Sequence, residues 1–302
     1  MISRRTRFAR FSPTLSGLCL LATMLAGSGC ATAPYRYGKD SEYIHGYRLP
    51  EGESQVVFGR PNRFLDASDW IWPGSWLSKL LLWNYKVDSH EVSTQTVAAI
   101  QQYLADNELR DVKVRINAYN VGDEWRRTFR NKAVGGGWRY TLGFISWLQY
   151  TILPQRFFGG DNYNPYSNTI NIYSDLIPVA LHEGGHSKDF AGRTYKGTYG
   201  FVYSVVPFFN LYPEGLASTD ALSYFRAQAN REQWVAAYKI LYPAYGTYLG
   251  GNIGEWLAFP WNYAIQLGAV IPCHIVGRIK AATVPEQIEP QPKPEEAPLT
   301  QP

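Results

Sequence analysis

The chain has 302 residues, which is enough for one large domain or two modest ones with a substantial hydrophobic core. Its formal net charge is only +4, and no basic stripe or nucleic-acid-binding motif accompanies that charge. The composition therefore argues against a nucleic-acid-binding protein, and the high aromatic share of 15% directs attention to the aromatic segments described below.

The first 29 residues are typical of an export signal. An arginine-rich start precedes an apolar run from Leu15 to Ala26, which is short for a membrane span. The small residues that lead into Cys30 resemble a bacterial lipobox, in which the cysteine is lipidated and becomes the new N-terminus. Ordinary cleavage after Ala33 is the alternative. An aspartate directly after the lipidated cysteine would resemble a signal for retention in the inner membrane, but this chain has Ala31 at that position. The lipobox resemblance therefore implies the outer membrane, facing the periplasm.

The rest of the chain divides by composition. Residues 30–66 are polar and rich in Gly, Pro and Tyr, which predicts an extended tether, and residues 67–283 are expected to form one domain. Residues 284–302 are rich in Pro and Glu and cannot bury a core, so they are predicted to be disordered. Cys273 is the one cysteine left beyond the lipobox, which excludes an intramolecular disulfide in the mature chain.

The first half of the domain contains predicted elements of both kinds. Residues 70–83 are aromatic and leucine-rich, consistent with a buried helix from Ser75 or with a membrane-contacting surface. A helix is expected to open at His90, and alternation in residues 111–121 predicts a strand with one buried face. Residues 122–160 form an irregular, aromatic-rich insertion. Within it, residues 138–153 fit a buried hairpin or helix equally as well as an interfacial element.

A metal-binding motif follows the next predicted strand, residues 168–173. His182 and His186 are four residues apart, so on a helix both imidazoles project from one face and can bind one metal ion. Glu183 lies beside that ion, placed to take a proton from a metal-bound water. Ser174 and Asp175 are expected to cap this helix, and Pro178 is tolerable in its first turn.

Two glycines stand inside the motif, Gly184 and Gly185, and each costs a helix about 1 kcal/mol relative to alanine. They are expected to let another element or a substrate come close to the helix.

Two histidines leave a catalytic zinc site incomplete, because three protein ligands and a water are usual. Glu214, on a predicted helix spanning residues 214–229, is the favoured third ligand, and Glu255 is the reserve candidate. With this pattern, residues 112–226 resemble the gluzincin metallopeptidases, which combine HExxH with a glutamate from a following helix. The metzincin branch does not fit, because Asp189 and Gly192 occupy the positions of its glycine and third histidine.

The resemblance implies an α+β fold, with a zincin-like domain whose small mixed sheet packs on the HExxH helix, followed by a mainly helical C-terminal part. In zincins, a strand placed like residues 168–173 forms the sheet edge to which an extended peptide adds. The remaining helices are expected at residues 233–241 and 262–282, with a break at Gly250 and Gly251 and a bend at Pro272.

The resemblance also implies an activity, hydrolysis of peptide bonds in a peptide or protein substrate. One Zn²⁺ per chain would be held by His182, His186 and Glu214, with Glu183 as the general base. The candidates for the group that stabilises the transition state are His274, Tyr245 and Tyr248. The candidates for groups that orient a ligand are Asp189, Ser218 and Asp220. Many gluzincins carry an aspartate four residues after the ligand glutamate, where this chain has Ser218.

A second hypothesis belongs to a different class. The chain could be a non-catalytic, metal-containing lipoprotein that acts as an envelope scaffold, with its aromatic segments binding a partner or membrane lipid. Such a site would be closed by a fourth protein ligand, for which Asp189 or Glu255 is available.

Overall fold

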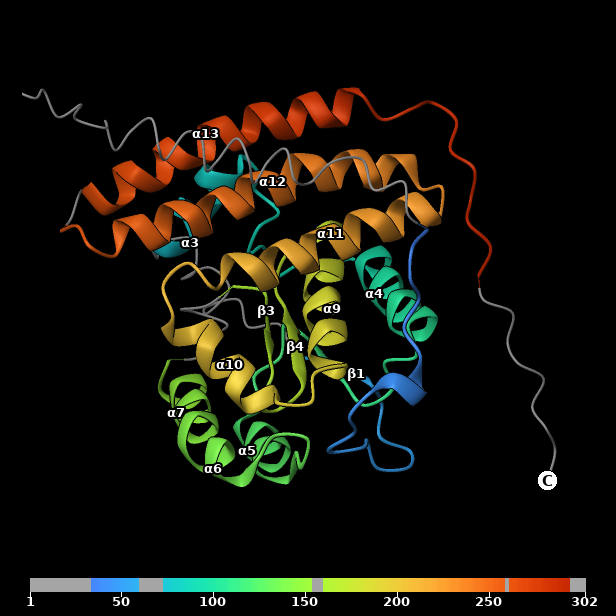
Figure 1. Ribbon diagram of the computed structural model, residues 1–302, viewed down its shortest axis with the longest axis vertical. Helices are drawn as coiled ribbons and strands as arrows, with labels where there is room; N and C mark the ends of the chain where they lie inside the picture. Colours follow the sequence, from blue (N-terminus) through green and yellow to red (C-terminus); the bar gives the residue numbers. More distant parts are fainter. Residues whose placement is uncertain (1–33, 60–72, 154–159, 259–260, 294–302) are drawn as a thin grey trace, which may run out of the picture. The chain divides into compact units, whose positions relative to one another are not determined.

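The computed structural model describes residues 34–59, 73–153, 160–258 and 261–293, and the predicted export signal and Cys30 lie outside them. From Tyr35 onward the chain forms one unit in which helices surround a small mixed sheet, an α+β arrangement (Figure 1). Its strands are β1 (Val56–Phe58), β2 (Lys113–Ile116), β3 (Asn162–Asn164) and β4 (Thr169–Ile172). Its helices are η1 (Asp40–Glu42), α3 (Pro73–Leu82), α4 (Thr94–Asp106), α5 (Val121–Arg130), α6 (Gly136–Trp138), η2 (Arg139–Gly143), α7 (Phe144–Ile152), α9 (Ile177–Ala191), α10 (Lys196–Val205), α11 (Leu211–Ala227), α12 (Arg231–Gly254) and α13 (Trp261–Ala282).

The sheet has the strand order β1–β2–β4–β3, with β1, β2 and β4 parallel and β3 antiparallel to β4. Every residue of β2 is buried, so the prediction of a strand with one buried face is wrong. The polar side chains of β2 are buried because each has a charged partner. Lys113 lies 2.6 Å from Glu53, and Arg115 pairs with Asp123 at 2.6 Å and also with Glu124.

The predicted strand at residues 168–173 is present as β4, but it lies inside the sheet. The edge on this side is β3, a three-residue strand that sequence periodicity does not reveal because it is too short. The backbone edge that an added strand could use therefore belongs to residues 162–164.

The segment predicted as a tether is part of the folded unit over residues 35–59. Tyr35 and Tyr37 are buried, and the Tyr35 hydroxyl donates to Asp220 at 3.0 Å, while β1 completes the sheet. The start of the predicted disordered tail also makes defined contacts: the backbone N–H of Gln291 donates to the carbonyl of Ala227, and its side chain accepts from the N–H of Tyr35. Composition misses these contacts because a few buried tyrosines are enough to hold a polar segment.

The metal-motif helix α9 packs between α4 and α11, and its two glycines make this possible. A Cβ on Gly184 would lie 2.6 Å from the ring of Tyr103 in α4, and a Cβ on Gly185 would lie 2.9 Å from the backbone of Ala217 in α11. The expectation that another element approaches the helix at these glycines is confirmed.

The expected cap of α9 is wrong. The residue that precedes the helix is Leu176, which makes no side-chain capping bond. Asp175 instead turns to the start of α4, where its carboxylate accepts from the N–H of Ser93 at 3.0 Å and from the hydroxyl of Thr96 at 2.7 Å. The carboxylate thus ties the beginnings of two neighbouring helices together.

The C-terminal part is helical, as expected, but α12 continues through Gly250 and Gly251 without the predicted break. The glycines of α12 serve packing instead. A Cβ on Gly250 would lie 2.6 Å from the backbone of Gln266 in α13, and one on Gly246 would lie 3.0 Å from Cys273. The two helices consequently run side by side in close contact (Figure 1). Within the described parts of the chain, no helix combines the length and the apolar character needed to cross a bilayer.

The aromatic-rich insertion is also mostly helical. Its helices α5, α6, η2 and α7 pack on one another through rings such as Trp125 and Trp147, whose centroids are 4.6 Å apart. Residues 138–153 are therefore helical, but they are not fully buried, since Tyr140, Ile145 and Ile152 are exposed.

The contact between α9 and α11 gives a first prediction. In Gly185→Ala the new methyl group meets backbone that cannot rotate away, so we expect the free energy of unfolding to fall by about 1–3 kcal/mol. Gly268→Ala is the matched control, because nothing lies within 4 Å of its added Cβ. That variant should be more stable than wild type by about 0.5–1 kcal/mol, from helix propensity alone. Denaturant unfolding followed by circular dichroism measures both, and equal stabilisation of the two variants would contradict the close contact.

Candidate metal centre

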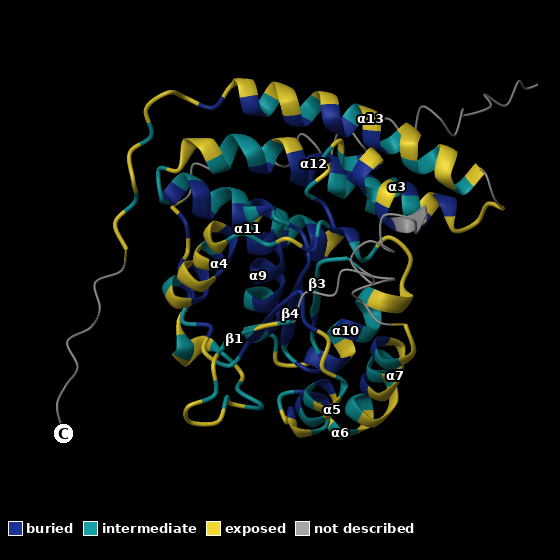
Figure 2. Cartoon of the chain, turned by 180° about the vertical axis from the view of Figure 1, so that it is seen from behind, coloured by how far each residue is buried: buried dark blue, intermediate teal, exposed yellow. Residues whose placement is uncertain are grey.

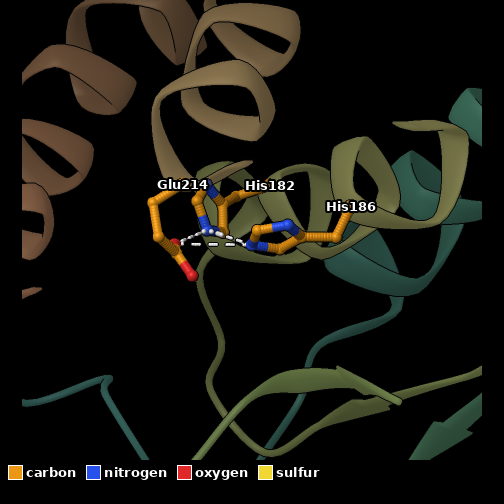
Figure 3. A group of neighbouring side chains, drawn as sticks. All are labelled: His182, His186 and Glu214. Carbon is orange, nitrogen blue, oxygen red and sulfur yellow. Dashed lines mark hydrogen bonds and ion pairs between the residues drawn. The ribbon is translucent and has the colours of Figure 1, made fainter. Parts of the chain in front are cut away.

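Two helices supply the residues of the site. His182 and His186 project from the same side of α9, and Glu214 projects toward them from the first turn of α11 (Figure 3). The chain between these helices turns back through α10, so a glutamate 28 residues beyond His186 returns to the same point. Sequence reasoning selected these three residues, and the structure brings them together.

The three donor groups face one another. The Nε2 atoms of His182 and His186 lie 3.1 Å apart, and the Oε2 atom of Glu214 lies 3.0 Å from the first and 3.4 Å from the second. All three side chains are buried, and their donor atoms lie within 4.8 Å of one another, so the group could hold a metal ion. The Nε2 atoms of the two histidines are buried and point at each other, and at most one of them can donate a hydrogen bond to the other. A cation bound by both nitrogens would also account for this arrangement.

The carboxyl groups at the centre have opposite pKa shifts. Burial raises the pKa of Glu214, but the neighbouring His186 and His182 outweigh burial and hold that pKa well below its usual range. Burial raises the pKa of Glu183 to about 8, partly opposed by the charge of His182. The two shifts are opposite because both imidazoles lie beside the Glu214 carboxylate and favour its charged form, whereas burial dominates at Glu183.

Of the three residues proposed to orient a ligand, one contacts a ligand. The hydroxyl of Ser218 lies 3.1 Å from Nδ1 of His182, which fixes the ring so that Nε2 faces the site. Asp189 pairs with Arg193 at 2.5 Å instead. Asp220, in α11, instead accepts hydrogen bonds from the hydroxyls of Tyr35 and Tyr103 and from the ammonium group of Lys188. Ser218 thus contacts a ligand, whereas Asp189 and Asp220 do not.

Tyrosines lie beside Glu214, including one that sequence reasoning missed. The hydroxyl of Tyr203, in α10, donates to Oε1 of Glu214 at 2.5 Å. Tyr248 and Tyr245, both candidates from the sequence, lie close enough to Glu214 that its charge adds to burial in raising their pKa values. The sequence carries 22 tyrosines, and nothing in the local pattern of Tyr203 sets it apart from the others.

Two further candidates are placed elsewhere. Both ring nitrogens of His274 are occupied, by the carbonyl of Leu81 at 2.8 Å and by the guanidinium of Arg278 at 2.8 Å, so His274 links α13 to α3 and is wrong as a transition-state stabiliser. Glu255 is exposed at the end of α12 and is not part of the donor group, which removes it as the third ligand.

Comparisons with protein-family models, with curated proteins and with solved structures find no match for this chain.

The donor group predicts how metal content depends on single residues. The purified protein should carry about one divalent metal ion per chain, His186→Ala should abolish binding, and Glu214→Ala should weaken it sharply, because each removes one of three buried ligands. Glu255→Ala is the matched control and should bind like wild type. Mass-spectrometric metal analysis after dialysis measures all four proteins. Undiminished metal in His186→Ala, or loss in Glu255→Ala, would show that the ion lies elsewhere.

Proposed function

We propose that the chain is a zinc-dependent peptidase whose metal is held by His182, His186 and Glu214. The observation that carries this proposal is the meeting of an HExxH pair with a glutamate from a second helix, the ligand pattern of the gluzincins. The small mixed sheet beside α9 and the helical C-terminal part support a zincin-like fold, in which β3 and β4 both contact the motif helix and β3 is the edge strand.

The spacing of the donor atoms supports zinc. Ligand atoms 2.0–2.2 Å from a tetrahedral zinc ion lie roughly 3.3 Å apart. The three donor pairs of this site are separated by 3.0, 3.1 and 3.4 Å, so the side chains need little movement to take up an ion. Two imidazoles and one carboxylate are also a donor set typical of catalytic zinc.

A catalytic site needs a free position, and the donor group supports one. Among the described residues, only these three side chains contribute His, Cys, Asp or Glu atoms to the group. Two residues could have closed the site with a fourth ligand. Asp189 instead forms an ion pair with Arg193, and Glu255 is exposed at the end of α12. This favours a peptidase over the scaffold hypothesis, which requires a fourth protein ligand.

The residues of the chain have distinct roles in the proposed reaction. A bound zinc ion supplies a water of lowered pKa. Glu183, one residue after His182, would accept the proton from the attacking water and deliver it to the leaving amine. Ser218 would hold the His182 ring in its orientation, and Tyr203 and Tyr248, which lie beside Glu214, are the candidates to stabilise the developing negative charge.

The substrate would bind as an extended peptide. Edge strand β3 packs beside α9, and the backbone of Tyr163 is close enough to the Glu183 carboxylate to lower its pKa slightly against the effect of burial. A peptide added along this edge would pass the general base with its backbone held by hydrogen bonds, which is how edge strands bind peptides in other proteins.

Glu183→Gln tests the activity separately from the metal. The variant keeps all three ligands, so it should retain its metal but lose peptidase activity on fluorescein-labelled casein by roughly a hundredfold or more. Glu255→Gln, which neutralises an exposed carboxylate, is the control and should remain active. Full activity in Glu183→Gln would overturn the mechanism, and a metal-loaded wild type with no peptidase activity would favour the structural site.

We also propose that the protein is a lipoprotein of the outer membrane, anchored at Cys30 and facing the periplasm. The proposal is supported by the lipobox resemblance. In cells given a labelled fatty acid, wild type should be labelled and Cys30→Ser should not, because the thioether to the lipid cannot form. Label in Cys30→Ser, or equally tight membrane association without the cysteine, would contradict the lipobox interpretation.

A further inference from the structure

The outward side of α13 is apolar along most of its length. A large apolar residue stands at every fourth position and is exposed to solvent: Tyr263, Leu267, Ile271, Ile275 and Ile279. Residues four apart share one face of a helix, and the outward face of a surface helix is normally polar. Figure 2 shows the exposed residues along α13, which packs by its other side on α12.

Neighbouring segments extend this surface. The end of α12 adds Ile253, the residues just after it add Trp256 and Leu257, and α13 itself begins with the exposed Trp261. Helix α3 adds Trp76 and Leu80, and Trp83 follows its last residue. Helix α3 is adjacent to α13, because the Trp83 ring stacks on His274 with centroids 4.0 Å apart. We call these residues, with the five of α13, the α3–α13 apolar face. Exposed apolar surface of this extent marks a site for a partner or a membrane.

The charges along α13 are of one sign. Between Glu255 and Glu286 the chain has no acidic residue, whereas Arg278 and Lys280 lie in the last turns of α13. The Arg278 guanidinium lies over the Trp83 ring, 4.7 Å from its centroid, so a cation and an exposed tryptophan are held together. Tryptophans beside basic residues at the border of an apolar surface are typical of segments that lie at a membrane interface.

The position of the N-terminal segment agrees with a nearby bilayer. Tyr35 bonds to Gln291, and Arg231 at the start of α12 bonds to the carbonyl of Pro285, so Tyr35 lies at the end of the helical layer where α13 finishes. Tyr35 is five residues after Cys30 in the sequence, and five residue steps span at most about 18 Å. If the proposed lipid anchor is correct, this end of the layer cannot be far from the membrane surface.

We propose that the α3–α13 apolar face binds the surface of a bilayer that contains anionic phospholipids. Helix α13 lies along that surface with its isoleucines among the acyl chains, because its opposite side is fixed on α12 through glycines. Trp256 and Trp261 lie at headgroup depth, and Arg278 and Lys280 contact lipid phosphates.

The test uses a chain that begins at Ala31, which lacks both the export signal and the lipid but keeps the unit that starts at Tyr35. The proposal predicts binding in cosedimentation with vesicles of phosphatidylethanolamine and phosphatidylglycerol. Ile271→Glu combined with Ile275→Glu should weaken binding by about tenfold or more, because it places two charges on the inserted face. Both side chains are half exposed, at 51% and 56%, so thermal unfolding should not change.

Ile145→Glu combined with Ile152→Glu is the matched control. These isoleucines on α7 are exposed to a similar degree, at 49% and 64%, within the segment that the sequence also offered as an interfacial element. This variant should bind like wild type, and wild type should bind more weakly to vesicles of phosphatidylcholine alone.

Other outcomes would overturn the proposal. Wild type could fail to bind, or it could bind equally to the two kinds of vesicle. The Ile145 and Ile152 substitutions could weaken binding as much as, or more than, those at Ile271 and Ile275. Finally, wild type could form a dimer in size-exclusion chromatography that the Ile271 and Ile275 substitutions dissociate. The last outcome would assign the face to a second copy of the chain.

Discussion

The site depends on how closely two helices approach each other. At Gly185 the backbone of α11 comes so near to α9 that a methyl group would lie 2.9 Å from Ala217, and only glycine leaves this space. Glu214 precedes Ala217 by one turn, so the same contact sets the depth at which its carboxylate meets the histidines. A glycine that weakens the helix by about 1 kcal/mol is thus the condition for a third ligand.

The other side of the same helix pair is held by a partly buried polar cluster. Asp220 of α11 accepts from Lys188 of α9 at 2.6 Å, and the hydroxyls of Tyr35 and Tyr103 complete its contacts at 3.0 and 2.5 Å. Because the Asp220 carboxylate accepts from three side chains on three different segments, the cluster stabilises one relative position of the helices rather than a range of them. Non-directional packing around Gly185 brings α9 and α11 together, and these hydrogen bonds fix how they are aligned.

The sequence predicts those parts of the protein whose signal is local. His182 and His186 are recognised because a helix turns their spacing into proximity, and the glycines between them correctly indicate a close neighbour. Glu214 required the gluzincin resemblance as well. The contribution of Tyr203 could not be predicted, because it depends on where α10 turns between the two ligand helices. The polar segment that holds Tyr35 was misassigned for the same reason, since its partners are distant in sequence.

The bond between Tyr35 and Gln291 joins residues 256 positions apart. Closing a loop of that length carries a large entropic cost, and contacts of high sequence separation slow folding. Tyr35 also donates to Asp220 of α11, and Gln291 donates to Ala227 at the end of the same helix. The first and the last of the described residues therefore meet beside α11, the helix that carries Glu214. A chain that emerges from its N-terminus must wait for Gln291 before this junction can form. The unit is therefore expected to complete its fold only after synthesis or transport has delivered the chain as far as that residue.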